Sequence, residues 1–168
     1  MLDIFLFIKE NKTNWGIIKI NMVIKLEQDM TKKDIEISIK YPALNRTVER
    51  IVSFLESADT QIECYLDKSI KLINASEIYY IESIDKKTVV FSEKESYSNK
   101  NPLYLLYEKL KNKGFVQISK YCIININKLE KITTLANSHL EAVLINGKCL
   151  YVTRKYLDNI RMLLQEDK

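Results

Sequence analysis

The fold of this chain is decided by the stretch Phe115–Leu129, which reads FVQISKYCIININKL. Apolar and β-branched residues dominate both of its ends, so it predicts two short β-strands. A polar corner of Ser119, Lys120 and Tyr121 lies between them. Loops that rigid strands hold in place commonly carry binding residues. This cationic corner is therefore the first candidate site in the sequence.

Outward from this stretch, length and charge indicate one domain with a small appendage. The chain has 168 residues, of which 46% are hydrophobic and 29% are charged with mixed sign. Such a chain can bury a real core, and its composition argues against wholesale disorder. The net charge is +4, and the basic surplus lies in residues 61–168 because residues 1–60 are balanced. A modestly basic C-terminal part suits a polyanionic partner.

Several function classes find no support in the residues. Cys64, Cys122 and Cys149 form no metal-binding pattern, and the lone His139 has no ligand spacing around it. There is no phosphate-binding loop and no catalytic motif. We therefore expect no enzyme activity, no cofactor and no metal. The odd number of cysteines and an N-terminal apolar run too short for a signal peptide or a membrane span predict a cytoplasmic protein.

The first 60 residues predict a small unit that precedes the main domain. Residues 1–21 are expected to form an irregular extension. Residues 22–60 are expected to form a strand-helix unit, since apolar residues alternate over 22–27 and 35–41. Helical apolar spacing then covers 44–55. This amphipathic helix either packs on the neighbouring strands or pairs two copies of the chain.

Residues 61–168 predict a mainly β domain with a few short helices. Short alternating segments follow one another closely between polar turns, which is typical of antiparallel meanders. The expected strands are 61–66, 70–73, 78–84, 88–92, 96–99, 115–118, 122–126, 129–135, 140–145 and 148–153. Pro102 and Gly114 bound one helix, and another is expected from Arg154. Asn146-Gly147 is the strongest hairpin signal in the chain.

An ordered set of motifs in this domain carries a resemblance to a known family. The motifs are EIYYIES at 77–83, a leucine-rich helix that ends at Phe115, FVQISK at 115–120, IIN at 123–125, NG at 146–147 and VTRKY at 152–156. In this order, residues 61–164 resemble the LytTR DNA-binding domain of bacterial transcription regulators. Residues 35–57 look like the N-terminal piece of short, stand-alone members, which lack the receiver domain that many relatives carry.

The resemblance implies an elongated fold of short antiparallel strands that contacts DNA through loops. Carried over position by position, it implies three DNA-contacting segments: Lys86, Lys87 and Thr88; Ser119, Lys120 and Tyr121; and Arg154 and Lys155. Lys and Arg side chains donate to guanine edges and to phosphates. Lys120 and Lys155 are expected to face base edges, and the other cations to hold the phosphate backbone. The alternative for Lys86-Lys87 is an ordinary solvated turn. Asn125 is expected to bond local backbone.

These features predict a sequence-specific DNA-binding transcriptional regulator, similar to a response regulator, that contacts direct repeats in promoter DNA as a homodimer. Tyr121 in place of the family's usual Ser predicts an unusual target site. Two alternatives stay open. Tyrosines among basic residues would suit a single-stranded nucleic-acid binder. The 22–60 unit would suit a protein-interaction module whose partner is a regulatory protein or a membrane protein.

Overall fold

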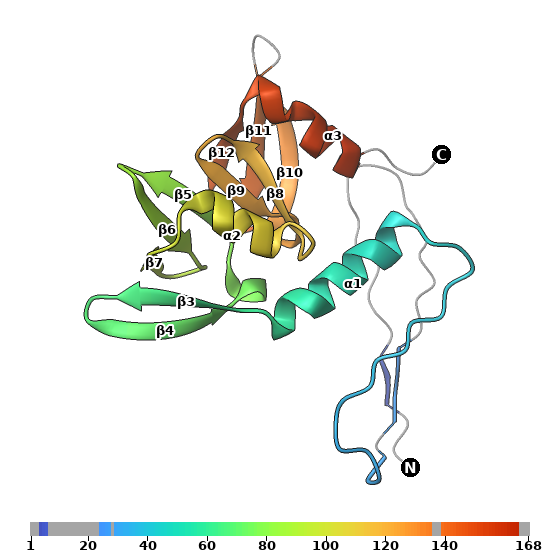
Figure 1. Cartoon of the computed structure of the whole chain (residues 1–168). Helices are drawn as coiled ribbons and strands as arrows, with labels where there is room; N and C mark the ends of the chain where they lie inside the picture. The colour runs from blue at the N-terminus through green and yellow to red at the C-terminus, as the bar shows by residue number, and fades with distance from the viewer. Residues whose placement is uncertain (1–3, 7–23, 28, 136–138, 165–168) are drawn as a thin grey trace. The chain divides into compact units, whose positions relative to one another are not determined.

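The chain contains two compact units, Met1–Lys40 and Tyr41–Lys168 (Figure 1). The computed structural model describes residues 4–6, 24–27, 29–135 and 139–164. Helix α1 (Arg46–Asp59) groups with the second unit. The domain boundaries expected at residues 21 and 60 stay predictions.

The N-terminal unit contains one short antiparallel pair. β1 (Ile4–Leu6) pairs with β2 (Ile24–Leu26), so part of the strand expected over 22–27 is formed. The prediction of a strand over residues 35–41 was wrong. That segment pairs with no strand among the described residues, and Ile35 is 93% exposed. Alternation predicts which side chains share a face, but a strand also needs a neighbouring strand to pair with.

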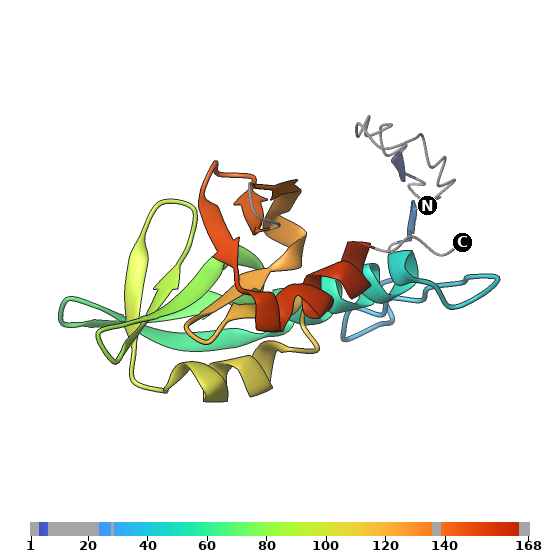
Figure 2. The same cartoon turned by 90° about the horizontal axis from the view of Figure 1, so that it is seen from above.

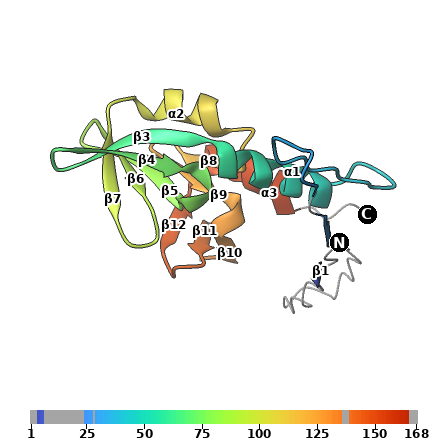
Figure 3. The same cartoon turned by 90° about the horizontal axis from the view of Figure 1, so that it is seen from below.

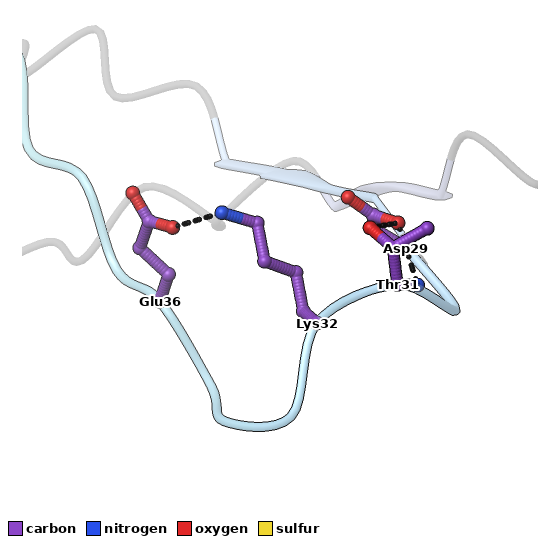
Figure 4. Close-up of polar contacts among 4 residues, drawn as sticks. All are labelled: Asp29, Thr31, Lys32 and Glu36. Atoms are coloured by element: carbon purple, nitrogen blue, oxygen red, sulfur yellow. Dashed lines mark hydrogen bonds and ion pairs between the residues drawn. The ribbon is translucent and has the colours of Figure 1, made fainter.

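Local polar contacts hold the segment after β2, as Figure 4 shows. The Asp29 carboxylate accepts a hydrogen bond from the Thr31 hydroxyl at 2.7 Å and another from the Thr31 backbone N–H at 2.9 Å. The hydroxyl bond, and then the backbone bond, lower the pKa of Asp29 because both favour its charged form. Lys32 Nζ lies 2.7 Å from Glu36 Oε2. Both partners of this ion pair are exposed, so it adds little stability.

The second unit is built on a seven-stranded antiparallel sheet in the order β4-β3-β7-β6-β5-β9-β8. Its strands are β3 (Gln61–Leu66), β4 (Ser69–Asn74), β5 (Tyr80–Ile84), β6 (Lys87–Phe91), β7 (Ser96–Asn99), β8 (Phe115–Ser119) and β9 (Cys122–Asn125). Hairpins join most sequence neighbours, as the closely spaced segments predicted. Two steps differ. Turn η1 (Ala75–Glu77) leads from the β4 edge to β5, and helix α2 (Leu103–Leu110) carries the chain from β7 to the β8 edge.

A three-stranded antiparallel sheet follows along the chain. It contains β10 (Leu129–Thr134), β11 (Leu140–Leu144) and β12 (Cys149–Val152), with β11 in the middle. The predicted Asn146-Gly147 hairpin turn joins β11 to β12. Gly147 has a φ of +79° there, a conformation that glycine adopts without strain.

Two apolar cores lie on opposite faces of the seven-stranded sheet. Helix α2 covers one face and the three-stranded sheet covers part of the other, as Figures 2 and 3 show. The first core includes Ile81 and Leu110, both fully buried. The second includes Ile118, Leu144 and Ile160, which come from three different elements. Burial of each such side chain is worth about 1.5–3 kcal/mol, so the cores tie distant segments together.

The helices begin close to the predicted positions. In α1, the Asn45 side chain caps the first turn by accepting the Val48 N–H at 3.1 Å, which confirms the helix expected over 44–55. Helix α2 follows Pro102 but ends at Leu110, four residues before Gly114. Helix α3 (Leu157–Leu164) continues from the short turn η4 (Arg154–Tyr156).

A buried amide lies where the chain passes from one sheet to the other. Asn125, the last residue of β9, is fully buried. Its Nδ2 donates to the Ile78 carbonyl at 3.0 Å and to the Ala75 carbonyl at 3.4 Å. Its Oδ1 accepts the Asn127 N–H at 3.0 Å in turn η2 (Ile126–Lys128). The expected local backbone bond is confirmed, and the same side chain also reaches a segment far away in the sequence.

Replacing Gly114 by alanine should destabilise the chain more than the same change at Gly147. Both residues have left-handed backbones, with φ of +81° and +79°, where an alanine costs about 1–2 kcal/mol. A Cβ at Gly114 would also lie 2.8 Å from Asn127 Nδ2, whereas one at Gly147 would meet nothing within 4 Å. Denaturant unfolding should therefore show a loss about 1 kcal/mol larger for Gly114→Ala. Equal losses would contradict the close packing of Gly114 against η2.

Candidate nucleic-acid interface

Strand register places two of the three predicted contact segments side by side. β9 pairs with β5 so that Cys122 lies opposite Glu82. One residue further along, the Ser83 N–H donates to the Tyr121 carbonyl at 2.8 Å. The β8–β9 corner therefore lies next to the end of β5, where the β5–β6 turn begins.

The third predicted segment, Arg154 and Lys155, is held beside the same corner by hydrogen bonds. The Thr153 N–H, directly after β12, donates to the Ile118 carbonyl at 2.9 Å. In α3, Asn159 Nδ2 donates to the Gln117 carbonyl at 3.0 Å. Both acceptor carbonyls lie in β8 just before the β8–β9 corner. The start of η4 is therefore held next to that corner. Sequence reasoning missed these two anchors because their partner carbonyls are 35 and 42 residues away.

The structure thus gathers the predicted residues at one end of the sheet, and most of them are accessible. The exposed cations are Lys86, Lys87, Lys120, Arg154 and Lys155. Tyr121 is 56% exposed and Ser119 is half-buried. Thr88 differs, since it is 4% exposed and shares the α2 face of the sheet with Val90. Its burial favours a structural role, and a DNA contact there is the least supported of these predictions.

The β5–β6 turn is a two-residue loop, Asp85-Lys86, because Ile84 pairs directly with Lys87. Both loop residues have left-handed backbones, with φ of +48° and +64°. Two successive residues of this kind make a type I′ turn, whose twist matches that of a hairpin. Neither residue is glycine, so each holds strain of about 1–2 kcal/mol. Such strain often accompanies binding sites.

The β8–β9 corner is equally tight. Ser119 pairs with Cys122 after a bulge in β8, and Ser119 Oγ accepts the Tyr121 N–H at 3.1 Å. Lys120 Nζ lies 5.4 Å from the centre of the Tyr121 ring, within cation–π range. A cation and an exposed aromatic ring are therefore presented together on a fixed backbone.

The electrostatic character of this end of the sheet is positive. The ion pairs within the described part of the chain involve other cations, namely Lys32, Lys111, Lys113 and Arg161. Burial, followed by the charge of Glu82, raises the pKa of Tyr80 to about 12. Burial, again followed by Glu82, raises the pKa of Cys122. The five exposed cations outnumber the nearby carboxylates of Glu82 and Asp85, so the net charge of this end attracts anions.

The chemistry available at this end is hydrogen bonding and charge attraction by ammonium and guanidinium groups. Within the described ranges, no group of three or more His, Cys, Asp or Glu side chains could hold a metal ion. Among those same residues, no helix has the length and apolarity needed to cross a membrane.

The family model of the LytTr DNA-binding domain matches residues 68–165. This match covers more than half of the chain, and the chain belongs to the LytTr DNA-binding domain family. The resemblance carried by the ordered motifs is thereby confirmed. The matched range contains all three of the predicted contact segments.

The relatives of this chain differ in length. A protein of Staphylococcus aureus strain MSSA476, described as an uncharacterized HTH-type transcriptional regulator, is 29% identical over 143 residues. That alignment covers 83% of this chain and 97% of the relative. The sensory transduction protein LytT of Bacillus anthracis is 26% identical over 131 residues, which cover 75% of this chain and 53% of LytT. The chain is therefore similar in extent to the first relative and to about half of the second.

A solved structure confirms the fold class. The LytTr DNA-binding domain of a methyl-accepting/DNA response regulator from Bacillus cereus matches with a TM-score of 0.59 and 24% identity. The match covers 63% of this chain and 97% of that domain. The shared fold is mainly antiparallel β with short helices. Strands separate α1, α2 and α3 along the described chain, so these helices form no helix-turn-helix pair.

Replacing Lys86 by glycine should leave the fold intact and stabilise it slightly. Glycine adopts the left-handed backbone of Lys86 without strain, and Asp-Gly is a preferred pair for a type I′ turn. We expect the free energy of unfolding, measured in denaturant, to rise by up to about 1 kcal/mol.

The matched control for this change is Lys68→Gly in the β3–β4 turn. In that turn Asp67 has a positive φ and Lys68 does not, so glycine relieves no strain at Lys68. The control variant should therefore lose a little stability through the added freedom of the unfolded chain. A loss at Lys86 as large as that at Lys68 would contradict the turn geometry.

Proposed function

We propose that this chain is a sequence-specific transcriptional regulator that binds duplex DNA with three loops at one end of its main sheet. Membership of a DNA-binding domain family supports DNA as the partner. The observation that carries the proposal is the gathering of five exposed cations from three remote segments of the chain. Clustered ammonium and guanidinium groups bind polyanions by displacing their counterions.

We assign two kinds of DNA contact to the residues of the three loops: contacts to base edges and contacts to the phosphate backbone. Lys120 on the rigid corner and Lys155 in η4 are the residues we assign to base edges, where lysine donates to guanine O6 and N7. Lys86, Lys87 and Arg154 are assigned to phosphates, which fix the register on the duplex. Tyr121 adds an exposed ring beside Lys120 that can contact a thymine methyl group.

The proposal extends to two copies bound to direct repeats in promoter DNA, in the cytoplasm. One copy presents one cluster of loops, which suits a single half-site. Helix α1 supports a protein contact, because none of its residues belongs to either apolar core. Its Val52 and Phe54 are 38% and 49% exposed. A second copy is the partner we propose for α1, and a regulatory or membrane protein is the alternative.

A single-stranded nucleic-acid binder is the rival function. Such proteins stack bases on a row of exposed aromatic rings. Here Tyr79, Tyr80 and Tyr97 are 5–7% exposed, and the exposed rings of residues 61–168 are divided among Tyr121 in the loop cluster, Tyr104 in α2 and Tyr151 in β12. Competition between duplex and single-stranded pools for the same protein separates the two functions, and we expect the duplex to win.

Alanine at Lys120 or at Lys155 should weaken binding to a cognate duplex. Selection of bound duplexes from a random pool supplies the site, and fluorescence anisotropy measures the affinity. Each change should cost about 1–3 kcal/mol on that site, because each removes hydrogen bonds to base edges. On an unrelated duplex the same variants should lose much less.

Lys71→Ala is the matched control for these two variants. Lys71 is exposed like the others but lies in β4, the strand at the opposite edge of the sheet order from β8. Its removal should leave cognate affinity unchanged. If Lys120→Ala and Lys155→Ala both bind the selected site as tightly as the parent chain does, the assignment of the loops is wrong.

A further inference from the structure

The turn between β11 and β12 belongs to none of the three predicted contact segments, yet it carries an exposed lysine, Lys148. Three backbone hydrogen bonds hold this turn in place. The Gly147 N–H donates to the Leu144 carbonyl at 2.8 Å, and the Leu144 N–H donates to the Lys148 carbonyl at 2.9 Å. The Ile145 N–H donates to the Lys128 carbonyl at 2.9 Å, which ties the turn to η2. The backbone that carries Lys148 is therefore fixed.

The Lys148 side chain reaches across to the seven-stranded sheet. Its Nζ lies 5.7 Å from the centre of the Tyr80 ring, which is itself stacked on Phe91 with centroids 4.3 Å apart. Tyr80 pairs with Ile124 in β9, on the face that the three-stranded sheet covers. The ammonium group thus sits over β5 near the strand that leads out of the β8–β9 corner.

The influence of the Lys148 charge on Cys122 is consistent with this location. Burial and then Glu82 raise the pKa of Cys122, and the charge of Lys148 acts in the opposite direction by lowering it. Lys148 is therefore within electrostatic reach of the Cys122 thiol. Cys122 directly follows Tyr121, so Lys148 approaches the corner from the side of the second sheet.

Register shows which groups share that face. Ile84 pairs with Lys87 across the β5–β6 hairpin. Because side chains alternate along a strand, these two lie on the same face as Glu82 and Cys122. Lys87 and Lys148 are thus on one face of the sheet: Lys148 lies over Tyr80, the first residue of β5, and Lys87 lies opposite Ile84, the last, with the half-buried Glu82 between these two positions of the strand. Among the described residues, Lys148 forms no salt bridge.

We propose that Lys148 is a further contact to the DNA phosphate backbone, so that the three-stranded sheet takes part in binding. This inference rests on the proposed function. The exposed ammonium group, on the same face as Lys87 and Cys122, would hold a phosphate flanking the bases that the corner reads. A contact of this kind carries no sequence information but adds affinity and salt dependence.

The test measures duplex affinity between about 50 and 200 mM salt for the parent chain and for Lys148→Met. Methionine keeps an apolar stem over Tyr80 but removes the charge. Affinity should fall by a similar factor, about three- to tenfold, on cognate and unrelated duplexes. The slope of log affinity against log salt should become shallower by about 0.9. Lys148→Arg, which keeps the charge, should retain both the affinity and the salt slope of the parent chain.

The matched control is Lys131→Met, an exposed lysine in β10 of the same small sheet, which should change neither quantity. Thermal unfolding of each variant verifies that the fold is retained. An unchanged salt slope in Lys148→Met, while Lys120→Ala and Lys155→Ala weaken cognate binding, overturns this inference and leaves the proposed function standing. If none of these variants affects duplex binding, both fail. A slope that falls equally in Lys131→Met also overturns the inference, since the effect would then be one of net charge.

Discussion

The hydrogen bonds of the buried Asn125 amide are the interaction on which the arrangement of the second unit depends. This one side chain satisfies the carbonyls of Ala75 and Ile78, where the chain enters β5, and the N–H of Asn127, where it enters the second sheet. Its own backbone N–H donates to the Tyr79 carbonyl at 2.9 Å. An apolar residue would leave the Ile78 carbonyl and the Asn127 N–H without these bonds, at about 1–3 kcal/mol each, whereas the Ala75 carbonyl would still accept the Ile78 N–H. The amide therefore sets where β9 ends relative to β5 and from where β10 starts.

The position of the candidate interface follows from how β9 is fixed against β5. With β9 fixed against β5, the corner before it must lie at the end of the β5–β6 hairpin. The second sheet, which starts from η2, covers the other face and returns the chain to β8 at Thr153. Three loops that lie far apart in the sequence therefore meet through hydrogen bonds to backbone carbonyls rather than through contacts between the side chains of their exposed cations. The lysine and arginine side chains of these loops are left exposed.

The sequence allowed the strands and helices of the second unit to be predicted well, because alternation and capping are local signals. The sheet order could not be read from it, because η1 and α2 carry the chain across the sheet by routes that no local pattern encodes. The segment 35–41 alternates like a strand but has no neighbour to pair with among the described residues. At the candidate site, residue type indicated the cations. It did not reveal that Thr88 faces inward, or that Lys148 approaches the corner, because both depend on how the sheets pack.

The two-residue connections at Asp85-Lys86 and Lys120-Tyr121 limit how this surface can diversify. Each joins strands whose pairing is already fixed on both sides, so an inserted residue would shift the register or push a hydrogen-bonded strand end out of place. Longer loops are therefore a poor route to a new specificity in this architecture. If this surface reads DNA as proposed, a new target sequence has to come from exchanging side chains on an unchanged backbone. Evolution and protein engineering alike would then work with a small set of substitutions at a few fixed positions.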